Sequence, residues 1–212
     1  MKSYVILISG RGSNMQALLD SNLPGQCAVV ISNRPDAIGL QTAAALGVAT
    51  AVVDDRQFAT REAFDAALGD VIERHAPDLI LLAGFMRILG EDFVKRFSGR
   101  MLNIHPSLLP DFPGIKTHAR ALAAGARVHG CTVHFVSAAL DGGPIIAHTQ
   151  VPVVAGDDEN TLAARVLAEE HRLYPRVARW FLEDRLRFAD GHISLDGKPL
   201  PPRGLDSAAD SA

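Results

Sequence analysis

Short apolar runs alternate with helical patterns along the first half of the chain. The apolar runs predict strands at Tyr4–Ile8, Ala28–Ser32, Thr50–Val53, Leu79–Ala83 and Met101–His105. The intervening patterns predict helices over Ser13–Ser21, Ile38–Leu46, Thr60–His75 and Glu91–Phe97. Strands that alternate with helices in this way favour right-handed crossovers and a parallel sheet that is covered on both faces.

The pattern changes after Pro110. A helix is predicted over Thr117–Ala124, followed by two β-rich runs, Gly130–Val136 and Ile145–Val153. Their short connection favours antiparallel pairing. A long amphipathic helix fits Asn160–Asp184, with Asp157 or Asp158 as its N-cap. The sequence therefore predicts an α/β fold: a Rossmann-like, mostly parallel sheet with helices on both faces and an antiparallel edge.

The length and composition suit one domain. The chain has 212 residues, of which 48% are hydrophobic, enough for a substantial core. We expect a single domain over residues 1–198, with 1–100 forming a nucleotide- or phosphate-binding half and 101–198 a second half. The segment 199–212 is rich in Pro, Ser, Ala and Asp, and is expected to be disordered.

The net charge and the cysteine content limit the kinds of partner and the cellular compartment that we expect. The formal net charge is -3, which gives no net attraction to nucleic acid or to an anionic membrane. The longest apolar run, Leu79–Met86, is far shorter than the ~20 residues that cross a bilayer. Cys27 and Cys131 are too few for a disulfide framework, and their apolar surroundings indicate buried, reduced thiols. We expect a cytoplasmic protein.

A glycine loop follows the first predicted strand. Gly10 and Gly12 permit a tight turn, and backbone N–H groups at the start of the next helix favour a phosphate. The alternative is a plain turn with Ser13 as N-cap. A dinucleotide fits less well, because Met15 stands where the fingerprint needs a third small residue. The second strand also leads into Arg34 instead of ending in an acidic residue, although Arg34 leaves a phosphorylated dinucleotide open.

Polar residues gather at the end of the fifth predicted strand. Leu102 and Ile104 face one side of that strand, so Asn103 and His105 face the other, and Pro106 ends it. Asn103 offers a donor and an acceptor, and His105 exchanges a proton near neutral pH. If Asp141 lies within reach, it favours the charged imidazole, and the three together suit chemistry on a carbonyl. An equally weighted alternative is that these residues only satisfy loop backbone.

Two other chemistries are disfavoured. Five histidines fall in one region: His105, His118, His129, His134 and His148. None forms a tight ligand pair on a helix, whereas zinc needs three or four well-placed ligands, so we expect no metal site. The chain has no Gly-x-Ser-x-Gly elbow, so a serine nucleophile is not expected.

Four motifs together resemble the phosphoribosylglycinamide formyltransferases, folate-dependent enzymes of purine biosynthesis. The motifs are Gly10-Arg11-Gly12-Ser13-Asn14, Leu82-Ala83-Gly84-Phe85-Met86-Arg87-Ile88-Leu89, Asn103-Ile104-His105-Pro106-Ser107-Leu108-Leu109-Pro110 and Leu140-Asp141-Gly142-Gly143-Pro144. The resemblance runs from the first strand to about Pro202. The third motif is shared by the wider formyltransferase superfamily, and the glycine loop and short length point to this member.

The resemblance implies direct attack of the amine of glycinamide ribonucleotide on the formyl carbon of 10-formyltetrahydrofolate, the co-substrate. It implies that His105 is the catalytic acid or base, that Asn103 binds the formyl oxygen, and that Asp141 favours the protonated histidine. A cis peptide is implied at Leu109–Pro110. Residues 101–198 then become the folate-binding and catalytic half.

The same resemblance implies the binding residues. Gly12, Ser13 and Asn14 should hold the substrate phosphate, and Glu170 the ribose. The folate should be bound by Arg61, Met86, Arg87, Ile88 and Leu89 together with Asn103. Arg61 is placed near the folate tail, and the other four line the pterin pocket.

Related activities remain as alternatives. Formyltetrahydrofolate hydrolase shares the Asn, His and Asp set but carries an additional N-terminal regulatory domain. Methionyl-tRNA formyltransferase carries a C-terminal nucleic-acid-binding domain. A non-catalytic nucleotide-binding sensor would need only the glycine loop. The expected partners are the two small-molecule substrates, with no nucleic acid or membrane, and the expected state is a monomer or weak homodimer.

Overall fold

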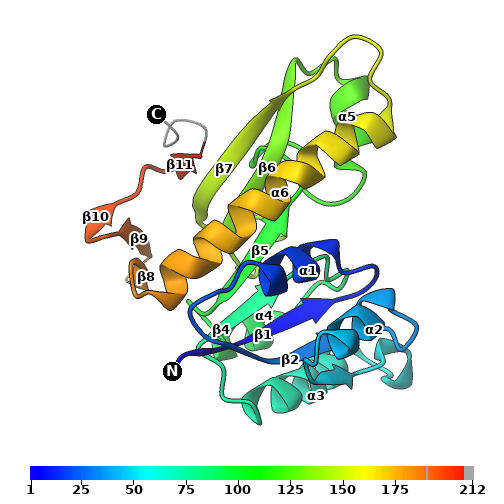
Figure 1. Cartoon of the computed structure of the whole chain (residues 1–212), viewed down its shortest axis with the longest axis vertical. Coiled ribbons are helices and arrows are strands. Elements are labelled where there is room, and N and C mark those ends of the chain that lie inside the picture. Colours follow the sequence, from blue (N-terminus) through cyan, green and yellow to red (C-terminus); the bar gives the residue numbers. More distant parts are fainter. Residues whose placement is uncertain (190, 208–212) are drawn as a thin grey trace.

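An eight-stranded sheet runs through the computed structural model, which describes residues 1–189 and 191–207 (Figure 1). Its strand order is β11-β7-β6-β5-β4-β1-β2-β3. The strands are β1 (Ser3–Ile8), β2 (Gln26–Ser32), β3 (Thr50–Val52), β4 (Leu79–Leu82), β5 (Met101–His105), β6 (Val128–Phe135), β7 (Ile145–Pro152) and β11 (Leu205–Asp206). Pairing is parallel from β3 to β5 and antiparallel across β5, β6 and β7. The predicted mixed sheet is confirmed.

The helices lie close to their predicted positions. They are α1 (Ser13–Asp20), α2 (Ile38–Ala45), α3 (Arg61–Glu73), α4 (Glu91–Arg96), α5 (Thr117–Ala123) and α6 (Glu159–Leu182), with a 3₁₀ turn at Asp55–Gln57. Thr60 caps α3, as predicted, by accepting a hydrogen bond from the Ala63 N–H. Asp158 caps α6 in a reciprocal box with Thr161, whereas Asp157 pairs with Arg165. The open choice between the two aspartates is thereby settled.

The sheet is buried on both faces because its strands carry apolar residues in both directions. Tyr4, Ile6 and Ile8 of β1 enter one core with residues of α1 and α6. The alternate residues Val5 and Leu7 enter the second core with residues of α3 and α4. This alternation is what a strand of a doubly covered sheet requires.

The chain beyond α6 adds structure that the sequence did not predict. A three-stranded antiparallel sheet comprises β8 (Leu186–Ala189), β9 (His192–Leu195) and β10 (Lys198–Pro199). The prediction of a disordered tail from residue 199 is corrected for its first part, because β11 pairs in parallel with β7. Pairing with the open edge of β7 supplies part of the physical reason, and the packing of Leu205 against the core and a hydrogen bond from Gln150 Nε2 to Asp206 Oδ2 supply the rest. The final part of that prediction, residues 208–212, lies outside the described residues.

The two cysteines differ in burial. Cys131 is buried as predicted, whereas Cys27 near the start of β2 is only half-buried, which corrects the prediction for that residue. Burial raises the pKa of Cys27 to about 12 and that of Cys131 as well. Both are free cysteines.

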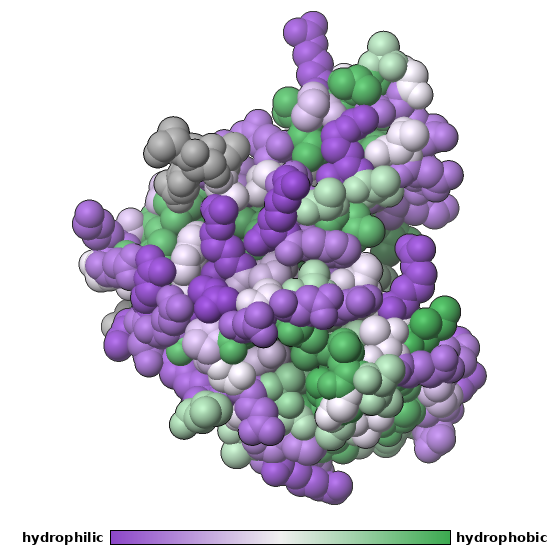
Figure 2. Space-filling model, viewed as in Figure 1, coloured by the Kyte–Doolittle hydropathy of each residue, from purple (hydrophilic) through white to green (hydrophobic). Residues whose placement is uncertain are grey.

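The surface is mainly hydrophilic on the face shown in Figure 2, and hydrophobic side chains gather in its lower half near α2. Ile38 and Leu46 belong to the exposed apolar residues of that region. Within the described part of the chain, no helix combines the length and apolarity that a bilayer span needs.

Candidate active site

Asn103 lies in the middle of β5, where its amide is oriented by a neighbour on β6. The antiparallel register sets Asn103 opposite His134, and Asn103 Nδ2 lies 3.1 Å from His134 Nε2. His134 Nδ1 lies 2.8 Å from the Phe135 carbonyl, which can only accept, so Nδ1 carries the hydrogen. Burial lowers the pKa of His134 and keeps the ring neutral. The bare Nε2 therefore accepts from Asn103 Nδ2, and this contact fixes the orientation of the amide.

His105 ends β5 and is held between two acceptors. Its Nδ1 lies 3.4 Å from Asp141 Oδ2, and its Nε2 lies 3.1 Å from the Phe112 carbonyl oxygen. Both side chains of the ion pair are largely buried, with 7% of His105 and 10% of Asp141 exposed. Only the imidazolium form can donate to both acceptors at once. The contact between Asp141 and His105, which the sequence left open, is present.

Asp141 reaches this position from the turn after β6. Its backbone has φ +49°, in the left-handed region that aspartate tolerates better than most residues. Gly143 passes so close to β6 that an added Cβ would collide with the Phe135 carbonyl oxygen. The carboxylate also accepts a 2.7 Å hydrogen bond from the Gly114 N–H. The conformation of this glycine-rich turn therefore places the Asp141 carboxylate next to the His105 ring.

A cavity opens beside these residues. Its lining includes Asn103, His134 and Asp141 on one side. The other lining residues are Leu82, Phe85, Arg87, Ile88, Leu89, Val136, Ser137, Ala138, Ala139 and Leu140. His105 is not among them, and it meets this lining through its contact with Asp141. The cavity thus combines an apolar floor with a few polar groups, which is usual for a small-molecule site.

The glycine loop forms a second hollow at the start of α1. Gly12 has φ +77°, and an added Cβ would come within 3.0 Å of the Gly39 Cα. The hollow is lined by residues of the loop and of the segment after β4: Ser9, Gly10, Arg11, Gly12, Ser13, Asn14, Ala83, Gly84 and Met86. No side chain caps α1, and its first residues, Ser13 and Asn14, line this hollow, where a helix start leaves backbone N–H groups without intrahelical partners.

Asn14 joins the glycine loop to α6. Its Nδ2 donates a 2.6 Å hydrogen bond to Glu170 Oε2, and both side chains are buried. Burial raises the pKa of Glu170, and the hydrogen bond from Asn14 opposes that shift. Asn14 Oδ1 is buried without a partner among the described residues. A ligand hydroxyl in this hollow would satisfy that acceptor.

A family model described as "Formyl transferase" matches residues 2–178 of the chain. The chain belongs to the formyl transferase family. It is 48% identical to phosphoribosylglycinamide formyltransferase of Escherichia coli (strain K12), with 95% of this chain and 97% of that protein aligned. It is 44% identical to the enzyme of the same name from Haemophilus influenzae, over 96% of this chain and 98% of the relative.

Solved structures agree with this assignment. The structure of phosphoribosylglycinamide formyltransferase from Coxiella burnetii superimposes with a TM-score of 0.93 at 44% identity, covering 97% of this chain and 98% of that one. The resemblance to formyl transferases that the motifs predicted is therefore confirmed, and the cis peptide at Leu109–Pro110 is present.

Two of the residues expected to contact folate lie outside the cavity beside Asn103. Arg61 lines a separate hollow with Asp65, Glu91 and Arg96, and Met86 lines the glycine-loop hollow. Arg87 does line the cavity, but its guanidinium lies 3.2 Å from Asp55 Oδ2. In this formyl transferase, the charge of Arg87 is thus paired with Asp55.

The sequence offered His134 only as one of five clustered histidines. Its partnership with Asn103 depends on the register between β5 and β6, which the predicted strands did not specify. No group of three or more His, Cys, Asp or Glu side chains within 1–189 and 191–207 is placed to hold a metal ion. His118 and His129 instead pack edge to face, with ring centroids 5.2 Å apart.

Proposed function

We propose that this formyl transferase moves the formyl group of 10-formyltetrahydrofolate to the amine of N1-(5-phospho-D-ribosyl)glycinamide, in purine biosynthesis. One observation carries the proposal. Asn103 and Asp141 stand together in the wall of a cavity, with His105 in contact with Asp141. The family and the similar enzymes supply the reaction, and the folate serves as co-substrate.

Asn103 is proposed to bind the formyl oxygen. One N–H of its amide is directed at His134, which leaves the second N–H available to the cavity. As the amine adds to the formyl carbon, negative charge develops on that oxygen. An amide already held in place stabilises this charge without having to reorganise.

His105 and Asp141 are proposed to supply charge and to assist proton transfer. A bond forms between the amine nitrogen and the formyl carbon, the bond from that carbon to N10 of the folate breaks, and one proton passes from the amine to N10. An imidazolium that donates to Asp141 Oδ2 and to the Phe112 carbonyl holds positive charge beside Asn103. That charge favours the oxyanion of the transition state.

The glycine-loop hollow is proposed to take the phosphate and ribose. Gly12, Ser13 and Asn14 surround the free N–H groups at the start of α1, and a helix start of this kind attracts phosphate. Glu170 accepts a hydrogen bond from Asn14 and is also proposed to hydrogen-bond a ribose hydroxyl.

The cavity beside Asn103 is proposed to take the pterin ring of the folate. Arg87, Ile88 and Leu89 contribute to its lining, and their backbone groups would read the polar edge of the ring. Met86 and Arg61 lie on either side of this segment, in the adjoining hollows. They are proposed to contact the parts of the folate that extend beyond the ring, with Arg61 near the tail.

The decisive experiment supplies 10-formyltetrahydrofolate with and without glycinamide ribonucleotide and measures loss of the formyl group. We expect turnover only when both substrates are present, with one formylated product per folate consumed. Equal deformylation without the amine would make the chain a hydrolase. Binding of both ligands without turnover would favour a sensor.

We further propose that the chain acts in the cytoplasm as a monomer or weak homodimer. Its two free cysteines support a reducing compartment. Sedimentation at several protein concentrations tests the oligomeric state, and a tight dimer at low concentration would contradict it.

A further inference from the structure

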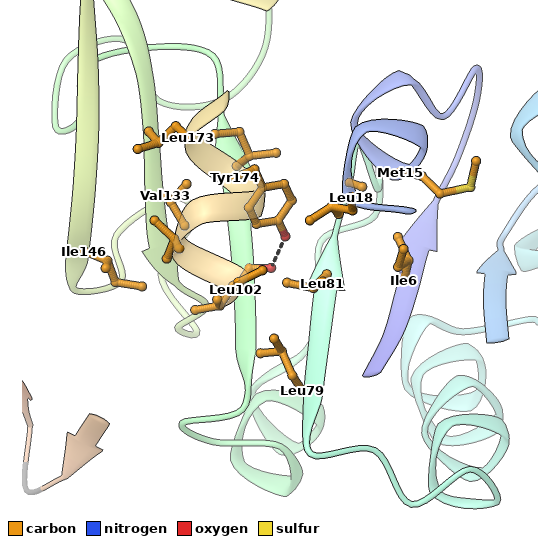
Figure 3. Packing of buried hydrophobic residues seen from close by; sticks show 14 of the residues in the cluster. Ile6, Met15, Leu18, Leu79, Leu81, Leu102, Val133, Ile146, Leu173 and Tyr174 are labelled. Carbon is orange, nitrogen blue, oxygen red and sulfur yellow. Dashed lines mark hydrogen bonds between the residues drawn. The ribbon is translucent and has the colours of Figure 1, made fainter. Parts of the chain in front are cut away.

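One tyrosine hydroxyl is enclosed in the larger apolar core. Tyr174 of α6 is wholly buried, and its hydroxyl lies 2.9 Å from the Leu102 carbonyl oxygen and 3.0 Å from the Leu82 carbonyl oxygen. Figure 3 shows the side chain extending from the helix to β5, surrounded by apolar residues. A hydroxyl has one hydrogen, so the two carbonyls share it.

The two carbonyls stand at the points where β4 and β5 reach the active site. Leu102 C=O belongs to the peptide that also contains the N–H of Asn103. Leu82 is the register partner of Asn103 on β4, and its carbonyl precedes the segment that lines both hollows. The hydroxyl of Tyr174 therefore links the backbone of Asn103 on β5 to the Leu82 carbonyl on β4, at the start of the segment that lines both hollows.

Apolar packing alone does not account for this hydroxyl. A phenylalanine would fill the same space, and a buried polar group adds stability only when its hydrogen bond is made. Glu170, one helical turn earlier on α6, likewise sends a buried polar group to Asn14 of the glycine loop. The same face of α6 thus holds both binding regions by directional contacts.

We propose that Tyr174 is a positioning residue for Asn103. Its hydroxyl holds the Leu102–Asn103 peptide at a fixed distance from β4, so that the Asn103 amide meets the formyl oxygen in the cavity. This inference rests on the proposed role of Asn103. The effect is expected on kcat, because a small displacement of a group that stabilises the transition state slows the chemical step.

The test compares Tyr174→Phe with Tyr4→Phe. Tyr4 lies in the same core, and the described structure records no hydrogen bond from its hydroxyl. We expect Tyr174→Phe to lower kcat roughly 10- to 100-fold with a KM for glycinamide ribonucleotide within about two-fold of the parent value. Tyr4→Phe should leave kcat within about two-fold. Assays are run well below the Tm of each variant, so that a loss of stability is measured separately from a loss of rate.

A double-mutant cycle with Asn103→Ala separates positioning from a general structural effect. If Tyr174 acts through Asn103, adding Tyr174→Phe to Asn103→Ala causes little further loss of kcat. A full additional loss would overturn the positioning role and leave the proposed function intact. A normal kcat for Asn103→Ala alone would instead overturn the role of Asn103 in the reaction. The side-chain amide resonance of Asn103 should also shift in Tyr174→Phe and stay unchanged in Tyr4→Phe.

Discussion

At the scale of single residues, Asp141 links three parts of the site. Its carboxylate receives the Gly114 N–H from the loop before α5 and faces the His105 ring at the end of β5. It also lines the cavity. Asp141→Asn therefore removes the negative charge that faces the His105 ring without emptying the space that the side chain fills.

We expect Asp141→Asn to lower kcat by about 100-fold or more, which is the usual range for loss of acid–base assistance. The glycine-loop hollow, where the phosphate is proposed to bind, lies at the start of α1 and shares no lining residue with the cavity, so binding of glycinamide ribonucleotide should change little. Steady-state kinetics and calorimetric titration measure the two effects. A near-parental kcat would show that the chemistry lies elsewhere.

His129 lies on β6, buried beside His118. Burial, together with nearby His118 and His105, lowers its pKa to about 4, against about 6.5 for an exposed histidine. Above pH 6.5 the ring is neutral in both the folded and the unfolded chain. As the pH falls toward 4, the unfolded chain binds a proton at this histidine that the folded chain does not bind, so the free energy of unfolding declines.

We expect this single group to remove on the order of 3 kcal/mol of unfolding free energy between pH 7 and pH 4. The comparison is urea unfolding of the parent and of His129→Gln at several pH values, because the carboxylates contribute equally to both. The free-energy curves should converge as the pH falls. Curves that stay parallel would contradict the buried neutral state of His129.

At the scale of elements, the sequence predicts the helices and strands that the short-range periodicity of apolar residues determines. The strands through β7 and the six helices lie within a few residues of expectation, because apolar repeats and caps such as Thr60 determine them locally. The small sheet of β8, β9 and β10 and the edge strand β11 have no such signal. β11 is two residues long, and it is held by pairing with β7 and by packing of Leu205 against a core whose other members are distant in sequence.

The candidate site likewise combines features that local sequence patterns predict with features that they do not determine. Asn103 and His105 were placed on one face of a strand by alternation alone, and their region could be recognised from the sequence motifs. The pairing of Asn103 with His134 depends on the exact register of two strands. The hydrogen bonds of the Tyr174 hydroxyl depend on where α6 crosses the sheet. Neither can be read from a local pattern, because both partners are distant in sequence.

The edge strand gives an element-scale prediction. Removing residues 204–212 deletes β11, including the 2.9 Å hydrogen bond from the Ser207 N–H to the His148 carbonyl, and exposes the edge of β7. We expect Tm to fall by about 2 to 8 °C. Self-association should also increase, because an open edge pairs with another chain.

Scanning calorimetry and sedimentation measure these two effects. Removing only residues 208–212 is the matched control, since β11 is retained. An unchanged Tm and an unchanged sedimentation coefficient for the longer deletion would show that β11 does not protect the edge.

At the scale of the whole molecule, the strand order separates the two cysteines. Cys27 lies on β2 and Cys131 on β6, with β1, β4 and β5 between them. Four strand spacings of about 4.8 Å place them about 19 Å apart, far beyond disulfide reach. Their raised pKa values also disfavour the reactive thiolate.

We therefore expect the native protein to react with a thiol reagent at pH 8 much more slowly than free cysteine does. Two thiols should be titrated after denaturation, and a reductant should leave Tm unchanged. Cys131→Ala and Cys27→Ala identify which thiol accounts for any slow reaction. Rapid labelling of Cys131 in the native state would contradict its burial.

Helix α6 has a consequence for how the chain folds. Its 24 residues pack against β4 and β5 as well as β6 and β7, so apolar residues of β4, within the first hundred positions, depend on a helix that begins at Glu159. The first hundred residues therefore do not complete their own apolar core. A ribosome that has synthesised only residues 1–100 has made α1 but not α6, so the part of this face that α6 covers, including β4, is still exposed. That face is completed only when α6 has left the exit tunnel, late in synthesis.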